Sequence, residues 1–125
     1  MTIKEVSQKY GLSQDTLRYY ERMGVIPPVQ RTAGGIRSYG EDDLGWVELA
    51  ICMRGAGLPI EALIEYVKLY REGDSTIPAR LQLLSEQREE LLAQKEKIET
   101  ALQRLDYKIS RYKAAEETGV LSWDD

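Results

Sequence analysis

The sequence predicts a mainly α-helical protein, in which a winged helix-turn-helix head precedes a long dimerisation helix that forms a coiled coil. Three observations predict this fold: two short capped helices joined by a tight turn, a basic hairpin after them, and a heptad pattern over about 40 residues. We expect the head over residues 1–73, the coiled-coil helix over 74–115 and a C-terminal tail over 116–125.

The helix-turn-helix comes first in the chain. A capping box formed by Thr2 and Glu5 begins the first helix, and Gly11 ends it. Ser13 caps the second helix, which we expect over residues 14–23. Two short helices with a glycine in the turn are typical of a DNA-binding motif, although a plain helical hairpin has the same outline.

The second helix has an inner and an outer face. Leu17, Tyr20 and Met23 can point toward the core. We expect Asp15 and Glu21, on the flanks, to be solvated or paired locally. The outer face offers hydrogen-bond donors and cations, which DNA phosphates and base edges accept. The outer residues are Gln14, Arg18, Tyr19 and Arg22.

A small hairpin is predicted within residues 29–39, with Gly34-Gly35 between its two arms. Arg37 and Tyr39 alternate onto one face of it, because successive side chains of an extended strand point to opposite sides. A basic, aromatic hairpin directly after a helix-turn-helix is typical of a wing.

The charge of the chain is divided between its two parts. The chain has 17 Lys and Arg against 21 Asp and Glu, a formal net charge of −4. Residues 1–40 nevertheless carry six basic and three acidic side chains, whereas the remaining 85 carry 11 basic and 18 acidic ones. A basic head on an acidic body is expected where only the head meets a polyanion.

Two more helices and a long one follow the wing. The third begins at the acidic residues 41–43 and ends near Gly55, and the fourth runs from Pro59 to Gly73. No glycine occurs from Thr76 to Ala115. Such a helix cannot bury its apolar seam alone, so we expect an obligate homodimer. The seam residues recur every seven positions at Ile77, Leu84, Leu91, Ile98, Leu105 and Tyr112, with Leu81, Arg88, Lys95, Leu102 and Ile109 between them.

Composition excludes most kinds of catalytic and metal site. The chain has no His and one Cys, so it can build neither a histidine-dependent catalytic site nor a structural zinc site of its own. We expect no cofactor, no metal and no enzymatic activity. The absence of a long apolar stretch and of a signal-peptide core predicts a cytoplasmic protein that does not bind membranes.

Five short runs occur in the order of these elements: Thr16-Leu17-Arg18-Tyr19-Tyr20-Glu21, Gly24-Val25-Ile26-Pro27-Pro28, Arg37-Ser38-Tyr39, Asp43-Leu44 and Gly57-Leu58. With the order of the elements, they resemble the MerR family of bacterial transcription regulators. The resemblance implies a homodimer, paired through an antiparallel coiled coil, that binds double-stranded promoter DNA between the promoter elements. It also implies that this DNA is bent and undertwisted, so that RNA polymerase can use an overlong spacer.

The same resemblance implies a set of DNA contacts. We expect Arg18 to read bases, and the tyrosines and the wing to anchor phosphates. The residues that match the family's contacts are Thr16, Arg18, Tyr19 and Tyr20 in the recognition helix, and Arg37 and Tyr39 in the wing.

Cys52 is the candidate effector-sensing residue. The stretch around it resembles the aldehyde- and electrophile-responsive, AdhR/NmlR-like subgroup of the family, which implies that a thiolate adduct shifts the packing of the heads. Cys52 also fits a small core residue, and the C-terminal end of a helix disfavours a thiolate. Three functions stay open: a thiol-switched regulator, a regulator that binds a non-covalent small ligand, and a signal-independent architectural DNA-binding dimer. A hydrolase or oxidoreductase is a distant fourth.

Overall fold

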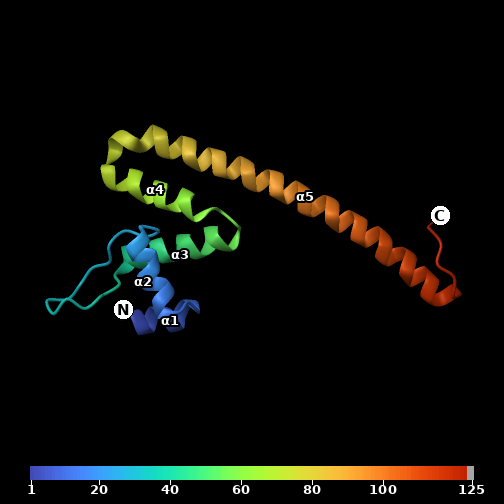
Figure 1. Cartoon of the computed structure of the whole chain (residues 1–125), viewed down its shortest axis with the longest axis horizontal. Coiled ribbons are helices and arrows are strands. Elements are labelled where there is room, and N and C mark those ends of the chain that lie inside the picture. The colour runs from blue at the N-terminus through green and yellow to red at the C-terminus, as the bar shows by residue number, and fades with distance from the viewer. Residues whose placement is uncertain (124–125) are drawn as a thin grey trace. The chain divides into compact units, whose positions relative to one another are not determined.

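The computed structural model describes residues 1–123 and contains two compact units, Met1–Gln87 and a second unit that begins at Arg88. The first unit contains helices α1 to α4, which form the head, and the first turns of α5 (Figure 1). Within residues 1–123, no helix is long and apolar enough to cross a membrane.

Local capping sets the ends of the first two helices, as predicted. Helix α1 spans Ile3–Tyr10 and begins at the Thr2 capping box, while α2 spans Gln14–Met23 and begins at Ser13. Gly11 and Gly24 end these helices with φ of 69° and 81°, in the left-handed region that costs glycine little.

The wing is a minimal hairpin between α2 and α3. An isolated antiparallel bridge joins Arg31 to Arg37, and the Thr32 N–H donates to the Ile36 carbonyl at 2.8 Å. Gly35 takes a φ of 81° at its tip. The predicted hairpin is therefore present. Within residues 1–123 it does not extend into a regular β-strand, since so short a pair of arms forms few hydrogen bonds between them.

Helices α3 (Glu41–Gly55) and α4 (Ile60–Glu72) complete the head and contribute buried residues to its core. The buried carboxylate of Asp43 accepts a hydrogen bond from the Gly40 N–H at 2.9 Å, which satisfies a donor at the start of α3. Met23 is exposed, contrary to its predicted core position, because it lies in the last turn of α2. The buried core consists of Val6, Leu17, Tyr20, Val25, Ile26, Val29, Tyr39, Val47, Ala50 and Leu63.

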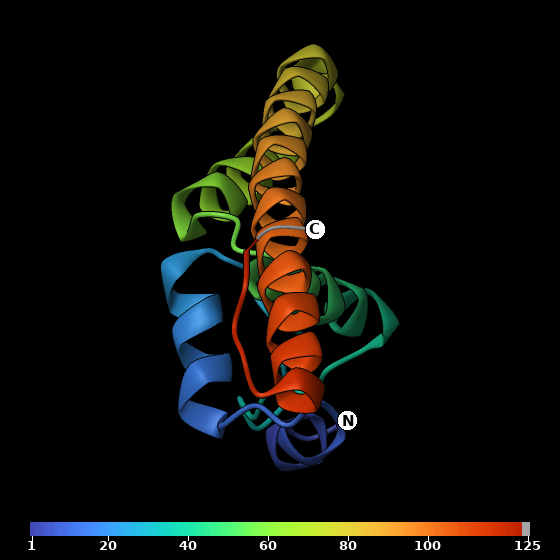
Figure 2. The same ribbon diagram turned by 90° about the vertical axis from the view of Figure 1, so that its right-hand side faces the viewer.

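Helix α5 spans Ile77–Thr118 and follows a single 3₁₀ turn, Asp74–Thr76. It runs three residues beyond the predicted end at residue 115, and Gly119 follows it with a φ of 77°. The described part of the tail then turns back along the end of the helix, as both views show (Figures 1 and 2). There the Trp123 ring lies 5.9 Å from that of Tyr112, and the Tyr107 hydroxyl donates to the Trp123 carbonyl.

Candidate nucleic-acid interface

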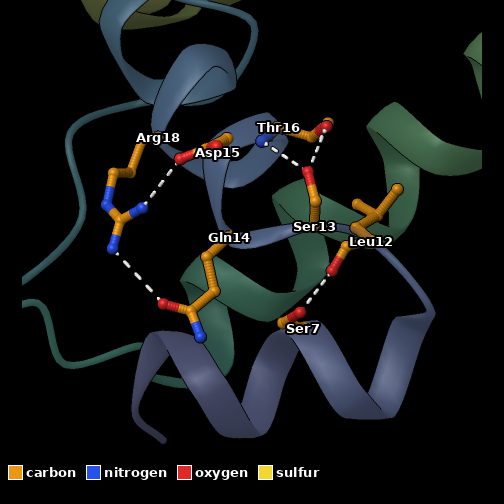
Figure 3. A network of polar contacts seen from close by, with 7 residues as sticks. All are labelled: Ser7, Leu12, Ser13, Gln14, Asp15, Thr16 and Arg18. Atoms are coloured by element: carbon orange, nitrogen blue, oxygen red, sulfur yellow. Dashed lines mark hydrogen bonds and ion pairs between the residues drawn. The ribbon is translucent and has the colours of Figure 1, made fainter.

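Side-chain hydrogen bonds hold the turn between α1 and α2 (Figure 3). The Ser7 hydroxyl donates to the Leu12 carbonyl, and the Ser13 hydroxyl accepts from the Thr16 N–H at 3.0 Å. The Thr16 and Ser13 hydroxyls are 2.8 Å apart. These bonds fix the first turn of α2, and with it the directions in which the α2 side chains leave the helix.

Arg18 lies on the outer face of α2. Its guanidinium donates to Asp15 Oδ1 at 3.1 Å and to the Gln14 side-chain oxygen at 3.3 Å (Figure 3). An exposed ion pair of this kind contributes at most about 1 kcal/mol, so the guanidinium can exchange it for a DNA acceptor. The side chain is thus oriented by its own helix while it stays available from outside.

The neighbouring outer residues are aromatic and basic. Tyr19 is exposed, and the Arg22 guanidinium lies 5.6 Å from the centroid of its ring. Thr16 is half-buried and its hydroxyl contacts Ser13. Arg18, Tyr19 and Arg22 therefore make up the accessible part of the predicted contact face on α2.

Two tyrosines of the predicted contact set, Tyr20 and Tyr39, are buried in the head of the single chain, and their contacts with DNA stay a prediction. Tyr20 is 9% exposed and Tyr39 is 2% exposed. Burial also raises the pKa of Tyr39, whose hydroxyl has no hydrogen-bond partner among the described residues. The alternation along the wing predicted that Tyr39 and Arg37 share a face, but this face is turned toward the head.

Arg37 lies against Glu21 of α2 rather than fully in solvent. Its Nε donates to Glu21 Oε1 at 2.6 Å, and Glu21 Oε2 accepts from the Val29 N–H at 2.8 Å. The sequence predicts that Glu21 is solvated or paired locally, but its partner Arg37 is 16 residues away. No local spacing rule could have indicated this pair.

Arg31 is a basic wing residue that the predicted contact set left out. Its side chain is exposed, donates to the Gly35 carbonyl at 3.0 Å and lies 3.9 Å from Glu21. The excess of basic residues in the first part of the chain was the signal that could have included it.

Cys52 lies in the last turn of α3, at the predicted end of the helix, and its side chain is exposed in the single chain. Arg54, the neighbouring cation, donates to the Leu58 carbonyl at 2.7 Å and closes the turn toward α4. The thiol is therefore accessible rather than packed in the core of the head.

Two short helices with a capped turn, whose second helix presents cations and an exposed tyrosine beside a basic wing, form the class of fold that reads duplex DNA. Residues 1–69 match the family model described as MerR HTH family regulatory protein. The chain therefore belongs to the MerR family of helix-turn-helix regulators, as the sequence motifs predicted.

Similar proteins of known sequence and structure agree with the assignment to the MerR family. The transcriptional regulator AdhR of Bacillus subtilis is 53% identical over 92 residues, which are 74% of this chain and 66% of AdhR. A MerR family transcriptional regulator from Listeria monocytogenes superposes with a TM-score of 0.89 and 48% identity, over 95% of this chain and 94% of that one. The regulator HiNmlR lacks a sensor domain and was crystallised bound to promoter DNA. It superposes with a TM-score of 0.86 and 30% identity, over 96% of this chain and 95% of HiNmlR. These relatives are transcription regulators, not enzymes.

Proposed function

We propose that the chain is a homodimeric regulator that binds promoter DNA through α2 and the wing, and distorts that DNA to control transcription by RNA polymerase. The observation that carries the proposal is the outer face of α2, where Arg18, Tyr19 and Arg22 are accessible. A relative similar over nearly the whole chain was crystallised on promoter DNA, which supports it.

In this proposal the contacts divide between bases and phosphates. Arg18 reads a base edge, for which a guanidinium is suited by its two parallel donors. Tyr19, Thr16 and the wing residue Arg37 anchor phosphates, together with the exposed Arg31. Tyr20 and Tyr39 support these contacts from the core.

The dimer forms through α5. Its apolar seam is exposed in the single chain, with Leu84 48% and Leu102 52% accessible, although apolar surface of this extent is normally covered. In an antiparallel pair, Ile77 faces Ile109 of the second copy, and Leu84 faces Leu102 of the second copy. This register pairs apolar residues at both ends and sets the heads at opposite ends of the pair.

In this proposal, deformation of the DNA follows from joining two heads through one pair of helices. Each head binds a half-site, and the distance between the heads sets the bend and twist of the DNA between them. The cost of deforming that DNA then controls its use by RNA polymerase, without new base contacts.

The signal in this proposal is a reactive aldehyde or another electrophile, or thiol stress, and the sensing group is Cys52. Its thiolate sulfur attacks the carbonyl carbon of an aldehyde, and the carbonyl oxygen takes up a proton, giving a hemithioacetal. The exposed position of Cys52 and the similarity to AdhR support this assignment. Adduct formation at the end of α3 would change the packing toward α4, since the Arg54–Leu58 bond lies in the same turn.

The head cavity nearest this turn leaves little room for a non-covalent ligand, whereas a larger, open cavity of about 500 Å³ lies between α3 and α4 beside Trp46 and Tyr66. The nearest cavity lies between α3, α4 and the start of α5 and has a volume of about 40 Å³, against roughly 300 Å³ for small ligand sites. Its lining includes Met53, Leu58, Tyr66 and Leu84.

The experiment is run-off transcription from the DNA upstream of the gene, comparing the wild type with Cys52→Ser, each with and without a short aldehyde. Cys52 is the single cysteine of the chain, so the variant removes every thiol. We expect both proteins to bind the DNA and only the wild type to respond. An equal response would leave the DNA-binding function in place and reject Cys52 as the sensor.

A further inference from the structure

The carboxylate of Glu21 joins α2 to the wing at several points. Oε1 accepts from Nε of Arg37 at 2.6 Å, and Oε2 accepts from the backbone N–H of Val29 at 2.8 Å. Nη2 of Arg31 lies 3.9 Å from Oε1. One side chain of the recognition helix thus contacts the segment that enters the wing and both residues of the wing's only β-bridge within the described chain.

The environment of Glu21 favours its ionised form. The Glu21 side chain is 10% exposed, and those of Arg37 and Arg31 are 24% and 45% exposed. Burial alone would raise the pKa of Glu21, but the hydrogen bonds from Arg37 and Val29 and the charges of the two arginines together lower it below its ordinary value. Charge-assisted hydrogen bonds of this kind are roughly twice as strong as neutral ones.

The wing itself has little internal stability. Two-stranded hairpins are marginal in water even when they are longer than this one. Its direction relative to α2 must therefore come from contacts with the head. The buried Tyr39 ring supplies an apolar contact, and its backbone exchanges two hydrogen bonds of 2.7 Å with Met1 at the end of the wing. Glu21 supplies the side-chain polar contact with α2.

We propose that Glu21 is a positioning residue for DNA binding, which holds the wing against α2 so that Arg31 and Arg18 reach the same duplex. This inference rests on the proposed function, since it requires that α2 and the wing bind DNA. Glu21 itself contacts no DNA in this proposal. It acts through the arginines of the wing.

The proposal and simple electrostatics predict opposite changes in DNA affinity when the charge of Glu21 is removed. An acidic residue on a basic DNA-binding surface repels phosphates, so its removal would normally strengthen binding. Glu21→Gln keeps the shape of the side chain and removes its charge. One of the two carboxylate oxygens becomes an NH₂ group, which cannot accept the hydrogen bond that Arg37 or Val29 donates there. We therefore expect weaker binding, by about tenfold, as for the loss of one charged hydrogen bond.

The test uses a duplex that the wild type selects from a random-sequence pool, titrated at one fixed salt concentration. Glu65→Gln is the matched control, because it changes the net charge equally at an exposed position of α4. Thermal melting followed by circular dichroism checks that each variant is folded. The expected result is a loss of about tenfold for Glu21→Gln and an unchanged affinity for Glu65→Gln.

Double variants separate positioning from general damage. Added to Arg31→Ala, Glu21→Gln should cost clearly less than it does in the wild type, because one of the two phosphate contacts of the wing is already lost. Added to Arg18→Ala, it should keep its full effect, since independent contacts add. If Glu21→Gln does not fold, Glu21→Asp keeps the charge but shortens the side chain away from Arg37, and it should give a smaller loss of affinity with the same pattern in the double variants.

Two results would overturn the proposal: affinity of folded Glu21→Gln equal to or above that of the wild type, or an equal loss in both double variants. A wild type that selects no sequence from the pool is a different failure. It would reject the proposed function, on which the inference rests.

Discussion

The hydroxyl of Tyr10, at the end of α1, donates a hydrogen bond of 2.6 Å to Oε1 of Glu48 in α3. The bond joins residues 38 positions apart and ties the helix-turn-helix to the helix that carries Cys52. The hydrogen bond, partial burial and the negative charge of Glu48 raise the pKa of Tyr10 to about 12.

This bond predicts a dependence of stability on pH. The folded pKa of Tyr10 is about 12, above the roughly 10 of an unfolded tyrosine, so the stabilisation is complete below about pH 10 and is lost as the pH rises toward 12. Tyr10→Phe removes it. Urea unfolding should give a difference from the wild type of about 0.5 kcal/mol at pH 8, a small value because the site is largely solvated.

The difference in unfolding free energy between the wild type and Tyr10→Phe should shrink between pH 10 and 12. Glu48→Gln keeps an acceptor for Tyr10 and removes the charge, so it should weaken this pH dependence. A difference that stays constant across this range would mean that the bond is not formed in solution.

Local signals predicted the helices well because each depends on residues close in sequence. The capping box at Thr2, the Ser13 cap and the two left-handed glycines that follow α1 and α2 all act within one turn of a helix. The head could therefore be divided into its helices before any tertiary contact was known.

Long-range contacts were not predictable in this way. Alternation indicated that Arg37 and Tyr39 share a face, but it could not indicate whether that face meets DNA or the core. The partner of Glu21 likewise depends on how the wing folds back onto α2. Trp123 packs on Tyr107 and Tyr112 only because the chain reverses at Gly119.

Arg18 and Arg22 should differ in what they contribute to DNA binding. Arg18→Ala should cost about 1–3 kcal/mol on the selected duplex and relax the sequence preference at one base pair. Arg22→Ala should weaken binding to all duplexes alike and reduce the salt dependence by about one phosphate contact. Titrations of both variants at three salt concentrations, on selected and random duplexes, measure the two effects. If Arg18→Ala lowered the affinity for random duplexes as much as for the selected duplex, base reading by Arg18 would be contradicted.

Disulfide trapping tests the direction of the coiled coil. In the proposed register, Leu84 of one copy faces Leu102 of the other, and the two Leu84 residues are about 27 Å apart along the axis. In a Cys52→Ser background, Leu84→Cys alone should therefore give no covalent dimer, while Leu84→Cys with Leu102→Cys should give one under mild oxidation. A disulfide needs Cα atoms about 4–7 Å apart, so the readout is specific.

The outward pair Glu86→Cys with Arg104→Cys is the control for random collisions and should stay monomeric on a non-reducing gel. A parallel pair would reverse the main result, because Leu84→Cys alone would then face its own copy.

Trp123 should stabilise the last turns of α5. Its ring lies 6.2 Å from that of Tyr107 and 5.9 Å from that of Tyr112, and the Lys108 ammonium lies 5.6 Å from its centroid. The side chains at this end of the helix are mostly exposed in the single chain, and the tail is also held by a bond of 2.7 Å from Arg111 Nε to the Ser122 carbonyl. Trp123→Ala removes these ring contacts, each worth about 0.5–1.5 kcal/mol, and the end of the helix should fray.

Amide hydrogen exchange measures this fraying residue by residue. We expect faster exchange over residues 107–118 in Trp123→Ala and unchanged exchange in α1 to α4, because those helices have their own core. Val120→Ala is the matched control, since Val120 is 70% exposed and its side chain is small. Protection that is the same in all three proteins would show that the reversed tail does not hold the helix end, and faster exchange throughout α5 would indicate that the tail supports the seam as a whole.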